Sequence, residues 1–457
     1  MSRPTRRSFA KSAASAVALT AASYSRVRGA NDRVALGFIG VGNRGDQLLD
    51  AFLPHKDIVP SAVCDVYDPY RAAAVEKISK SIGAVFGKAC VQLKDYRKLL
   101  DMKEIDAVVI ATPDHWHALT FVEACRAGKH VYCEKPLSLT IGEGRRMADV
   151  AKETKRVTQV GLHRRSTPFV QEAVKLIQSG AIGKVTVAKC YHHRNETPMG
   201  IGSPPDGEPP EGLDYDMWLG PAKKVPYNAN HCLYKFRWFW DYSGGQLTNF
   251  GTHYLDVIQW AIQQDAPKAV ACLGGKFGTS DNREIPDTCE AIWEYDNCLV
   301  TFSQFNCNAS VGNPRGSSME FRGTLGTLLL ADGAAGYEII PENVRTEEMP
   351  ALSPIARAAN AKQGRATKQA RLPEAKKGEG ESATLHARSF LDGIKNGTPT
   401  TCPVEVGHRS TSATLLARIA LMRKKYLTWD AKAERVTNDP EANELLGYEY
   451  RSPWKLG

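Results

Sequence analysis

Three glycines, Gly40, Gly42 and Gly45, recur as Gly-x-Gly-x-x-Gly directly after an apolar run and at the start of an amphipathic one. The chemistry that this spacing suits is the binding of a pyrophosphate. Gly40 permits a tight turn, Gly42 lets the backbone approach the phosphates, and Gly45 lets a helix pack closely on a strand. The helix that starts near Asn43 and Arg44 supplies amide donors and the positive end of its dipole. The motif predicts a dinucleotide-binding loop.

A carboxylate, Asp65, follows about 20 residues after Gly45, at the end of the second apolar run. There it can accept hydrogen bonds from the adenosine ribose diol and repel a 2′-phosphate, which favours NAD over NADP. Arg71 follows closely and could tolerate a phosphate, so NADP stays the second choice. The alternative, a glycine-rich turn with an incidental acid, fits the flanking strand and helix less well.

The segments around this motif alternate short apolar runs with amphipathic helical stretches. Strands are expected at 33–41, 58–66, 106–111, 130–133 and 157–160, and helices at 43–53, 69–81, 117–127 and 141–153. The strands are continuously apolar, as expected when helices cover both faces of a parallel sheet. Residues 33–160 are therefore predicted to form a doubly wound α/β Rossmann domain.

After about residue 165 the pattern becomes richer in β-type segments. A helix is expected at 167–179, strands at 184–193, 269–277, 289–306 and 318–330, and closing helices at 386–396 and 407–425. This pattern predicts that residues 161–457 form an α+β domain with a large, mostly antiparallel open sheet. The Pro- and Gly-rich stretch 198–226 is expected to be an irregular loop bordering the site, and the basic stretch 356–381 a mobile surface segment.

The first thirty residues resemble a twin-arginine export signal, because Thr5-Arg6-Arg7-Ser8-Phe9-Ala10-Lys11 precedes an Ala-rich stretch over 12–23. This predicts a signal peptide at 1–30, the twin-arginine translocase as a partner and a periplasmic location. The apolar run is too short for stable membrane insertion. A disordered basic tail is the alternative.

The net charge of +9 comes mostly from this start, which holds six basic residues and no acid. The nearly balanced remainder lacks the dense cationic face that nucleic-acid binding needs, so no nucleic-acid partner is expected. The eleven cysteines include no Cys-x-x-Cys pair. Neither a disulfide framework nor a zinc site is therefore expected.

Three further polar motifs follow the glycine loop: Thr112–His117 (TPDHWH), Glu134-Lys135-Pro136, and Gly244–Asp256 (GGQLTNFGTHYLD). The first two come at carboxyl ends of predicted strands, where open α/β sheets bind ligands. From about residue 33 to the C-terminus, the order of these motifs resembles the glucose-fructose oxidoreductase and inositol dehydrogenase family, also called Gfo/Idh/MocA. The resemblance implies an NAD(P)-dependent oxidoreductase that acts on a sugar, polyol or sugar derivative.

The resemblance also implies the catalytic role of Lys135, as general acid/base beside the nicotinamide. A base must take the hydroxyl proton while hydride leaves to the ring, and a lysine near that ring can have a lowered pKa. Glu134 could orient the ammonium. The alternative is a surface Glu-Lys pair at a strand end.

His253 occupies the family's second catalytic position, where an imidazole can hydrogen-bond the reacting oxygen or relay its proton. The family commonly has an aspartate four residues earlier, but this chain has Asn249, which cannot accept a proton and is expected to be a hydrogen-bonding contact. By the same resemblance, further substrate contacts are expected at His163 and Arg164, and cofactor contacts at Thr112, Pro113, His115 and His117.

The aromatic stretch 236–242, with Trp240, could supply stacking faces for a sugar ring, although core packing explains such a run equally well. Metal is not expected at His115-x-His117 or His192-His193, because neither pair has further ligands at a recognised spacing.

The leading hypothesis is reversible dehydrogenation of a sugar or polyol in the periplasm. Because an exported enzyme meets no replenished dinucleotide pool, NAD is expected to stay tightly bound and to be regenerated in each turnover. The first alternative is a glycosidase or lyase that oxidises the sugar transiently and reduces it back. The second is a non-catalytic sugar-binding protein. The resemblance also implies a homo-oligomer joined through the β-rich domain.

Overall fold

The computed structural model describes residues 33–82, 90–310, 312, 316–331, 336–346, 367–370, 377 and 382–457. The signal peptide predicted at 1–30 lies outside these residues, as does most of the segment predicted as mobile at 356–381. Within that segment, β17 (Thr367–Gln369) pairs with β16 (Asn343–Arg345), and the mobility of the segment stays a prediction. Among the described residues, no helix is long and apolar enough to cross a membrane.

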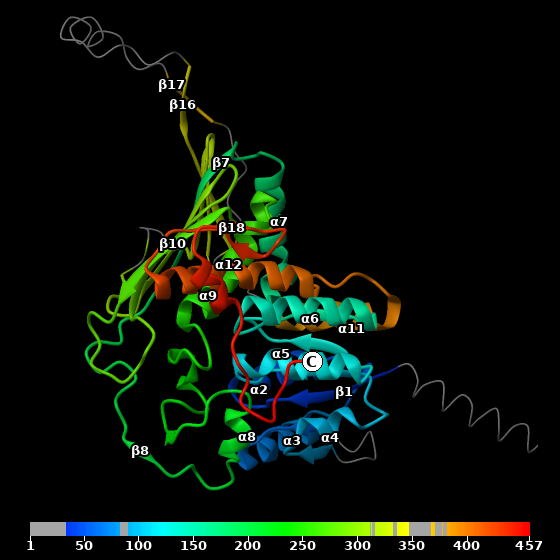
Figure 1. Ribbon diagram of the computed structural model, residues 1–457. Helices are drawn as coiled ribbons and strands as arrows, with labels where there is room; N and C mark the ends of the chain where they lie inside the picture. Colours follow the sequence, from blue (N-terminus) through cyan, green and yellow to red (C-terminus); the bar gives the residue numbers. More distant parts are fainter. Residues whose placement is uncertain are drawn as a thin grey trace, which may run out of the picture.

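The N-terminal body is a six-stranded parallel sheet, which confirms the predicted Rossmann architecture (Figure 1). In spatial order its strands are β3 (Val91–Leu93), β2 (Ile58–Cys64), β1 (Val34–Ile39), β4 (Ala107–Ile110), β5 (His130–Cys133) and β6 (Thr158–Val160). The strand order reverses between β1 and β4. Ile39 lies opposite both Cys64 and Ile110, so the carboxyl ends of β2, β1 and β4 reach the same edge of the sheet.

The helices that connect these strands are α2 (Asn43–Phe52), α3 (Asp68–Ile82), α4 (Tyr96–Leu100), α5 (Asp114–Arg126) and α6 (Ile141–Thr154). Two helices show why they begin where they do. The α6 helix starts with a capping box between Thr140 and Glu143. The α5 helix starts at Asp114, three residues before the prediction, with Pro113 at its N-cap and an acid in its first turn, where the helix dipole favours negative charge.

The C-terminal body contains a nine-stranded sheet that is antiparallel except for one parallel pair, β7 and β12, which confirms the prediction. Its strand order is β15 (Tyr337–Pro341), β14 (Gly326–Leu330), β13 (Met319–Gly323), β7 (Val185–His193), β12 (Leu299–Phe305), β11 (Thr288–Glu294), β10 (Ala269–Gly275), β18 (Leu427–Asp430) and β19 (Arg435–Val436). The expected strands at 289–306 and 318–330 are each two strands that pair as hairpins.

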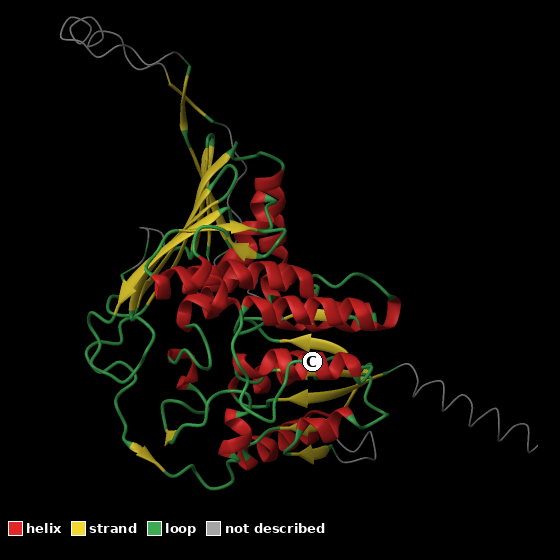
Figure 2. Cartoon of the chain, viewed as in Figure 1, coloured by secondary structure: helices red, strands yellow, loops and turns green. Residues whose placement is uncertain are grey.

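Three helices, α7 (Pro168–Gln178), α9 (Gly245–Ile262) and α12 (Val404–Arg423), share a core with this sheet and lie on one side of it in Figure 2. Trp293 of β11 is fully buried there and donates its indole N–H to Ala413 O at 2.8 Å. Alternate β11 residues such as Glu290 and Glu294 are exposed in the single chain. The homo-oligomer expected through this domain stays a prediction.

The chain returns to the Rossmann body through α11 (Ala383–Asn396). Phe390 packs edge-on against Phe52 and Tyr132, with ring centroids 6.4 and 5.9 Å apart. Figure 1 shows α12 beside α6, and these two helices pack against each other, whereas α11 packs against α2 on the opposite face of the parallel sheet. Residues of α11 therefore complete the core of the Rossmann body, although they lie far beyond the domain boundary predicted at residue 160.

A long connection between β7 and α9 also crosses back to the Rossmann body. It contains β8 (Asp206–Gly207), α8 (Tyr215–Leu219), β9 (Tyr227–Asn228) and the 3-10 turn η3 (Lys235–Trp238). The Asp68 N–H donates to Gly212 O and the Asp214 N–H donates to Val66 O, both at 3.0 Å. These bonds fix the predicted loop against the end of β2.

Candidate active site

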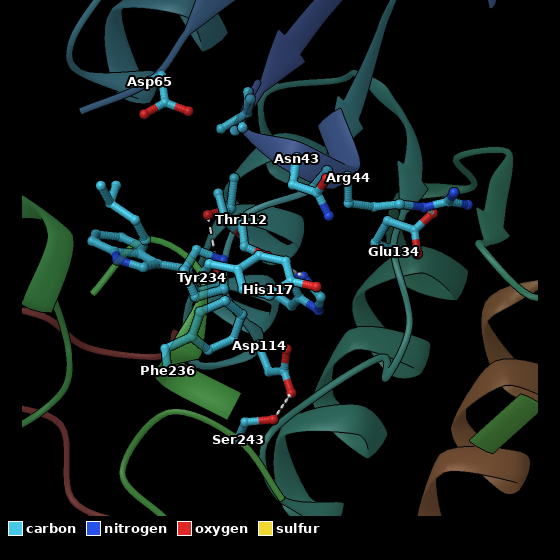
Figure 3. A pocket seen from close by; sticks show the side chains of 18 of the residues that line it. Asn43, Arg44, Asp65, Thr112, Asp114, His117, Glu134, Tyr234, Phe236 and Ser243 are labelled. Atoms are coloured by element: carbon cyan, nitrogen blue, oxygen red, sulfur yellow. Dashed lines mark hydrogen bonds and ion pairs between the residues drawn. The ribbon is translucent and has the colours of Figure 1, made fainter. Parts of the chain in front are cut away.

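A cavity of about 350 Å³ opens at the carboxyl ends of β1, β2, β4 and β5, where the strand order reverses. Residues from η3 and α9 supply the opposite wall, so both bodies contribute to the site (Figure 3). The predicted site residues that line the cavity are Gly40, Gly42, Asn43, Arg44, Asp65, Thr112, Pro113, His117, Glu134, Lys135, His163, Asn249 and His253.

The glycine loop has two positions that exclude any side chain. Gly40 has a φ of +80°, and a Cβ there would lie 2.7 Å from the backbone of Ala111. A Cβ on Gly45 would lie 2.1 Å from Gly40 O, so this glycine lets α2 pack on β1 as expected. At Gly42 the nearest neighbour is the ring of Tyr70, 2.8 Å from where a Cβ would stand. At all three glycines, atoms of neighbouring residues therefore pack directly against the backbone of the loop.

Asp65 ties this loop to the end of β2. Its two carboxylate oxygens accept the N–H groups of Val41 at 2.8 Å and Tyr67 at 3.0 Å. Burial raises the pKa of Asp65, and these two hydrogen bonds oppose that rise. The guanidinium of Arg71 donates to Asp65 O and pairs with Asp68, so it is occupied by the protein itself.

Arg44 and Glu134 form a nearly buried ion pair between α2 and the end of β5, with Nε and Oε1 2.8 Å apart. Burial acts to raise the pKa of Glu134, but Arg44 and Lys135 hold it below the usual value. The second oxygen of Glu134 accepts the backbone N–H of Lys135 at 3.1 Å. Glu134 was expected to orient the ammonium of Lys135; instead it fixes the backbone of that residue and the guanidinium of Arg44.

The ammonium of Lys135 donates to a neutral partner. Its Nζ lies 2.6 Å from Asn249 Oδ1 on α9, and the Asn249 amide is oriented because its Nδ2 donates to Gln246 Oε1 at 2.8 Å. Burial lowers the pKa of Lys135 to about 8, with Glu134 opposing the shift and Arg44 and Arg237 adding to it. This is the pKa range in which a lysine can give and take protons near neutral pH.

His253 lies one turn further along α9 and faces His163, with ring centroids 5.1 Å apart. Burial, with the nearby charge of Lys135, holds the pKa of His253 well below its usual value. The imidazole is therefore neutral at neutral pH and offers one donor and one acceptor.

Buried polar atoms of this cavity that find no hydrogen-bond partner among the described residues include Arg44 Nη2, Thr112 Oγ1 and His253 Nδ1. Unpaired buried polar groups are costly, about 1–3 kcal/mol each, and are common where a ligand completes a site. Arg44 belongs to the glycine motif, Thr112 adjoins Gly40, and His253 is close enough to Lys135 for that charge to lower its pKa. The residues present therefore fit a dinucleotide that runs from the loop to the lysine.

Some of the predicted site residues lie elsewhere. Gly45 is inside the contact between α2 and β1. Arg164 stacks over Tyr254 at 4.8 Å, and Trp240 lies under Arg418 at 5.3 Å. None of the three lines the cavity. Direct ligand contacts of these residues stay predictions that their placement does not favour.

The two histidines of the Thr112–His117 motif point to different sides, because residues two apart on a helix face nearly opposite directions. His117 lines the cavity but directs its ring nitrogens to Pro136 O at 2.8 Å and Thr112 O at 2.9 Å. His115 is fully buried, faces Trp218 O at 3.1 Å and does not line the cavity. His115 was expected to contact cofactor, and the early start of α5 turns it away.

Asp114, Ser243 and Arg237 are among the polar residues of the cavity that sequence reasoning missed. Ser243 donates to the carboxylate of Asp114 at 2.5 Å, as Figure 3 shows, and burial raises the pKa of Asp114. Arg237, in the aromatic stretch that was considered for sugar stacking, lies 4.6 Å from the ring centroid of Tyr234. Asp114 stands inside a motif already noted, whereas Ser243 carries no signal in the sequence.

Curated relatives match short parts of this chain. A levoglucosan dehydrogenase of Pseudarthrobacter phenanthrenivorans is 44% identical over 91 residues, 20% of this chain and 23% of that protein. A glycosyl hydrolase family 109 protein of Shewanella sp. (strain ANA-3) is 35% identical over 123 residues, 27% of each chain. The matched part thus spans about a quarter of these relatives.

A levoglucosan dehydrogenase solved with NADH and levoglucosan has a TM-score of 0.60 and 18% identity, over 87% of this chain and 99% of the other, and shares the fold. Three family models match in succession: the NAD-binding Rossmann fold of an oxidoreductase family at residues 34–162, its C-terminal alpha/beta domain at 167–273, and a Gfo/Idh/MocA C-terminal domain at 224–329. Because these models together cover more than half of the sequence, the chain belongs to the Gfo/Idh/MocA oxidoreductase family.

Proposed function

We propose that this protein is an NAD-dependent oxidoreductase that oxidises a secondary alcohol of a sugar or polyol and can run in reverse. The observation that carries the proposal is the ammonium of Lys135, placed between the glycine-loop end of the cavity and His253, with a pKa lowered to about 8. Bound NAD would supply the hydride acceptor. The levoglucosan dehydrogenase relative supports a carbohydrate substrate.

Lys135 takes the hydroxyl proton as its neutral amine. With a pKa of about 8, roughly one tenth of the lysines are neutral at pH 7. The proton moves from the substrate oxygen to Nζ while the C–H bond gives up its hydride. Asn249 Oδ1 then accepts a hydrogen bond from the ammonium, and neutral His253 can donate to or accept from the substrate oxygen.

The cofactor end supports NAD as the dinucleotide. Asp65 presents a carboxylate where the ribose diol binds in such folds. Arg71, the cation that could have held a 2′-phosphate, already pairs with Asp68 and the carbonyl of Asp65. We also propose that the protein is exported and keeps NAD bound through turnover.

The test begins with the purified protein. Denaturation followed by chromatography should release about one NAD per chain, and a panel of sugars and polyols should produce reduced nicotinamide, seen by its absorbance or fluorescence. A protein that holds no dinucleotide and binds none when it is added would end the proposal.

A second candidate function is redox-assisted cleavage of a glycoside, in which the sugar is oxidised, loses its substituent and is reduced again. Two observations favour it: the family 109 glycosyl hydrolase relative, and the buried acid Asp114 in the same cavity. The raised pKa of Asp114 would let it donate a proton to a leaving group.

This candidate predicts release of the aglycone without net accumulation of NADH. Asp114→Asn should abolish that release and leave oxidation of a free sugar within a few-fold of the unmodified protein. Steady NADH production that matches substrate consumption would instead support the dehydrogenase.

A further inference from the structure

The charged residues that line the cavity do not balance. Its acids are Asp65, Asp114 and Glu134, and its cations are Arg44, Lys94, Lys135 and Arg237. Asp65 is held by backbone N–H groups, Glu134 pairs with Arg44, and Lys94 pairs with Asp68 outside the cavity. What remains at the reacting end is two cations, Lys135 and Arg237, against Asp114, whose raised pKa favours its neutral form.

Arg237, like Lys135, has no ion-pair partner among the described residues. It makes no hydrogen bond and no ion pair with any residue in the part of the chain that the structure describes. Its guanidinium instead lies over two rings, 4.6 Å from the centroid of Tyr234 and 5.9 Å from that of Phe236. Such stacking holds the planar group while its N–H donors stay available at the edges.

The backbone beneath Arg237 is anchored. The next residue, Trp238, is 4% exposed, and its carbonyl accepts the N–H groups of Glu284 at 3.1 Å and Ile285 at 3.2 Å. Arg283 stacks on the Trp238 ring at 4.2 Å. The 3-10 turn η3 therefore presents Arg237 from a fixed base.

Arg237 belongs to the substrate end of the cavity. Figure 3 shows Phe236, Asp114 and Ser243 at the end opposite Asp65. The charge of Arg237 is also felt by Lys135 and Asp114, since it adds to the burial that lowers the pKa of Lys135 and opposes the burial that raises that of Asp114. A cation in this place is poorly sited to hold the pyrophosphate beside the glycine loop.

We propose that Arg237 selects a sugar acid, by pairing with a carboxylate of the substrate whose hydroxyl is presented to Lys135. This inference rests on the proposed function and names its substrate class. A guanidinium offers two parallel N–H donors that match the two oxygens of a planar carboxylate. A neutral sugar would leave this charge uncompensated in a partly buried cavity.

The test compares a uronic acid with its uncharged methyl ester, on the protein loaded with NAD. The unmodified protein should prefer the acid in kcat/KM and in binding affinity, measured by calorimetry. Arg237→Gln should reduce both values for the acid by about 10- to 100-fold and change those for the ester less than threefold. Arg237→Lys should restore part of the preference. Arg97→Gln, a stacked arginine outside the cavity, is the matched control.

Equal preference for acid and ester in the unmodified protein and in Arg237→Gln overturns the inference. A stronger preference for a sugar phosphate or sulfate than for the carboxylate overturns the choice of anion. The calorimetric measurement distinguishes failure of this inference from failure of the proposed function. Selective binding of the acid that depends on Arg237, without turnover, supports the sugar-acid class and contradicts the dehydrogenase. Turnover of the ester without turnover of the acid supports the dehydrogenase and contradicts the sugar-acid class.

Discussion

The two ends of the cavity are built in different ways. At the glycine-loop end, the Asp65 carboxylate accepts the backbone N–H groups of Val41 and Tyr67, and both of these residues lie within 24 residues of it. At the reacting end, Lys135 meets Asn249, 114 residues away, and Asp114 meets Ser243, 129 residues away. The glycine-loop end is built from local contacts of the Rossmann body, and the reacting end exists only when the two bodies are packed together.

The largest effect is expected from Lys135→Met at the reacting end. It removes the proton acceptor but keeps the length of the side chain, so sugar oxidation should fall by about 10²–10⁴-fold. Bound NAD should stay, because the glycine loop is untouched. Rates and cofactor content are measured on the same preparation, with Lys98→Met, an exposed lysine on α4, as control. Loss of cofactor together with activity would show that the two ends are not separable.

The complementary change is Asp65→Asn at the cofactor end. An amide cannot accept both backbone N–H groups, so the loop should loosen and the Kd for NADH should rise by about 10- to 100-fold. At saturating NAD, kcat should stay within about threefold of the unmodified value. Fluorescence titration measures the affinity, and Asp50→Asn, at an exposed position on α2, serves as control. An unchanged Kd would remove Asp65 from the binding site.

Lys135→Met should also stabilise the fold. The folded-state pKa of Lys135 is about 8, below the ordinary lysine value of 10.5, so burying the charged form costs free energy at pH 7. Between these two values the unfolded chain binds more protons, and stability contributed by this group rises with pH. At pH 7 the variant should gain about 1–3 kcal/mol in free energy of unfolding, and less near pH 10. Urea unfolding at pH 7 and near pH 10 measures whether the variant gains free energy of unfolding and whether that gain becomes smaller as the pH rises.

The smallest effect expected is a shift of the pH profile in Asn249→Asp. A carboxylate beside Lys135 Nζ stabilises the ammonium and should raise the pKa of Lys135 by about one unit. The rising limb of kcat/KM for oxidation, near pH 8 in the unmodified protein, should move up accordingly. Asn249→Ala, which adds no charge, should not move the limb upward. Identical pH profiles for all three proteins would mean that the rising limb reports the pKa of a group other than Lys135.

The contrast between the two ends also explains what the sequence could predict. The glycine loop and Asp65 act through neighbours along the chain, so spacing alone identified them. Asp114 meets Ser243 only through tertiary packing, and no local pattern announces that contact. Arg237 stacks on its sequence neighbours Tyr234 and Phe236, but only the packing of the two bodies places it in the cavity. His115 was misplaced because a run of polar residues does not show the helical phase, which was set by the early start of α5 at Asp114.

The fold shows the same division. The long buried strands and helices were predicted because their apolar periodicity is strong. The short elements β3 and α4 were missed, since Val91 and Gln92 are exposed and give no such signal. Pairing with β14 stabilises β15, and pairing with β10 stabilises β18, although both segments are too short to be recognised alone.

The placement of Phe390 has a consequence for synthesis on the ribosome. Phe52 and Tyr132 emerge more than two hundred residues before the aromatic ring that covers them. The nascent first half therefore carries an open apolar patch until α11 has left the exit tunnel. A fragment that stops at residue 160 should aggregate or recruit chaperones, and adding α11 as a separate peptide should slow that loss of soluble material.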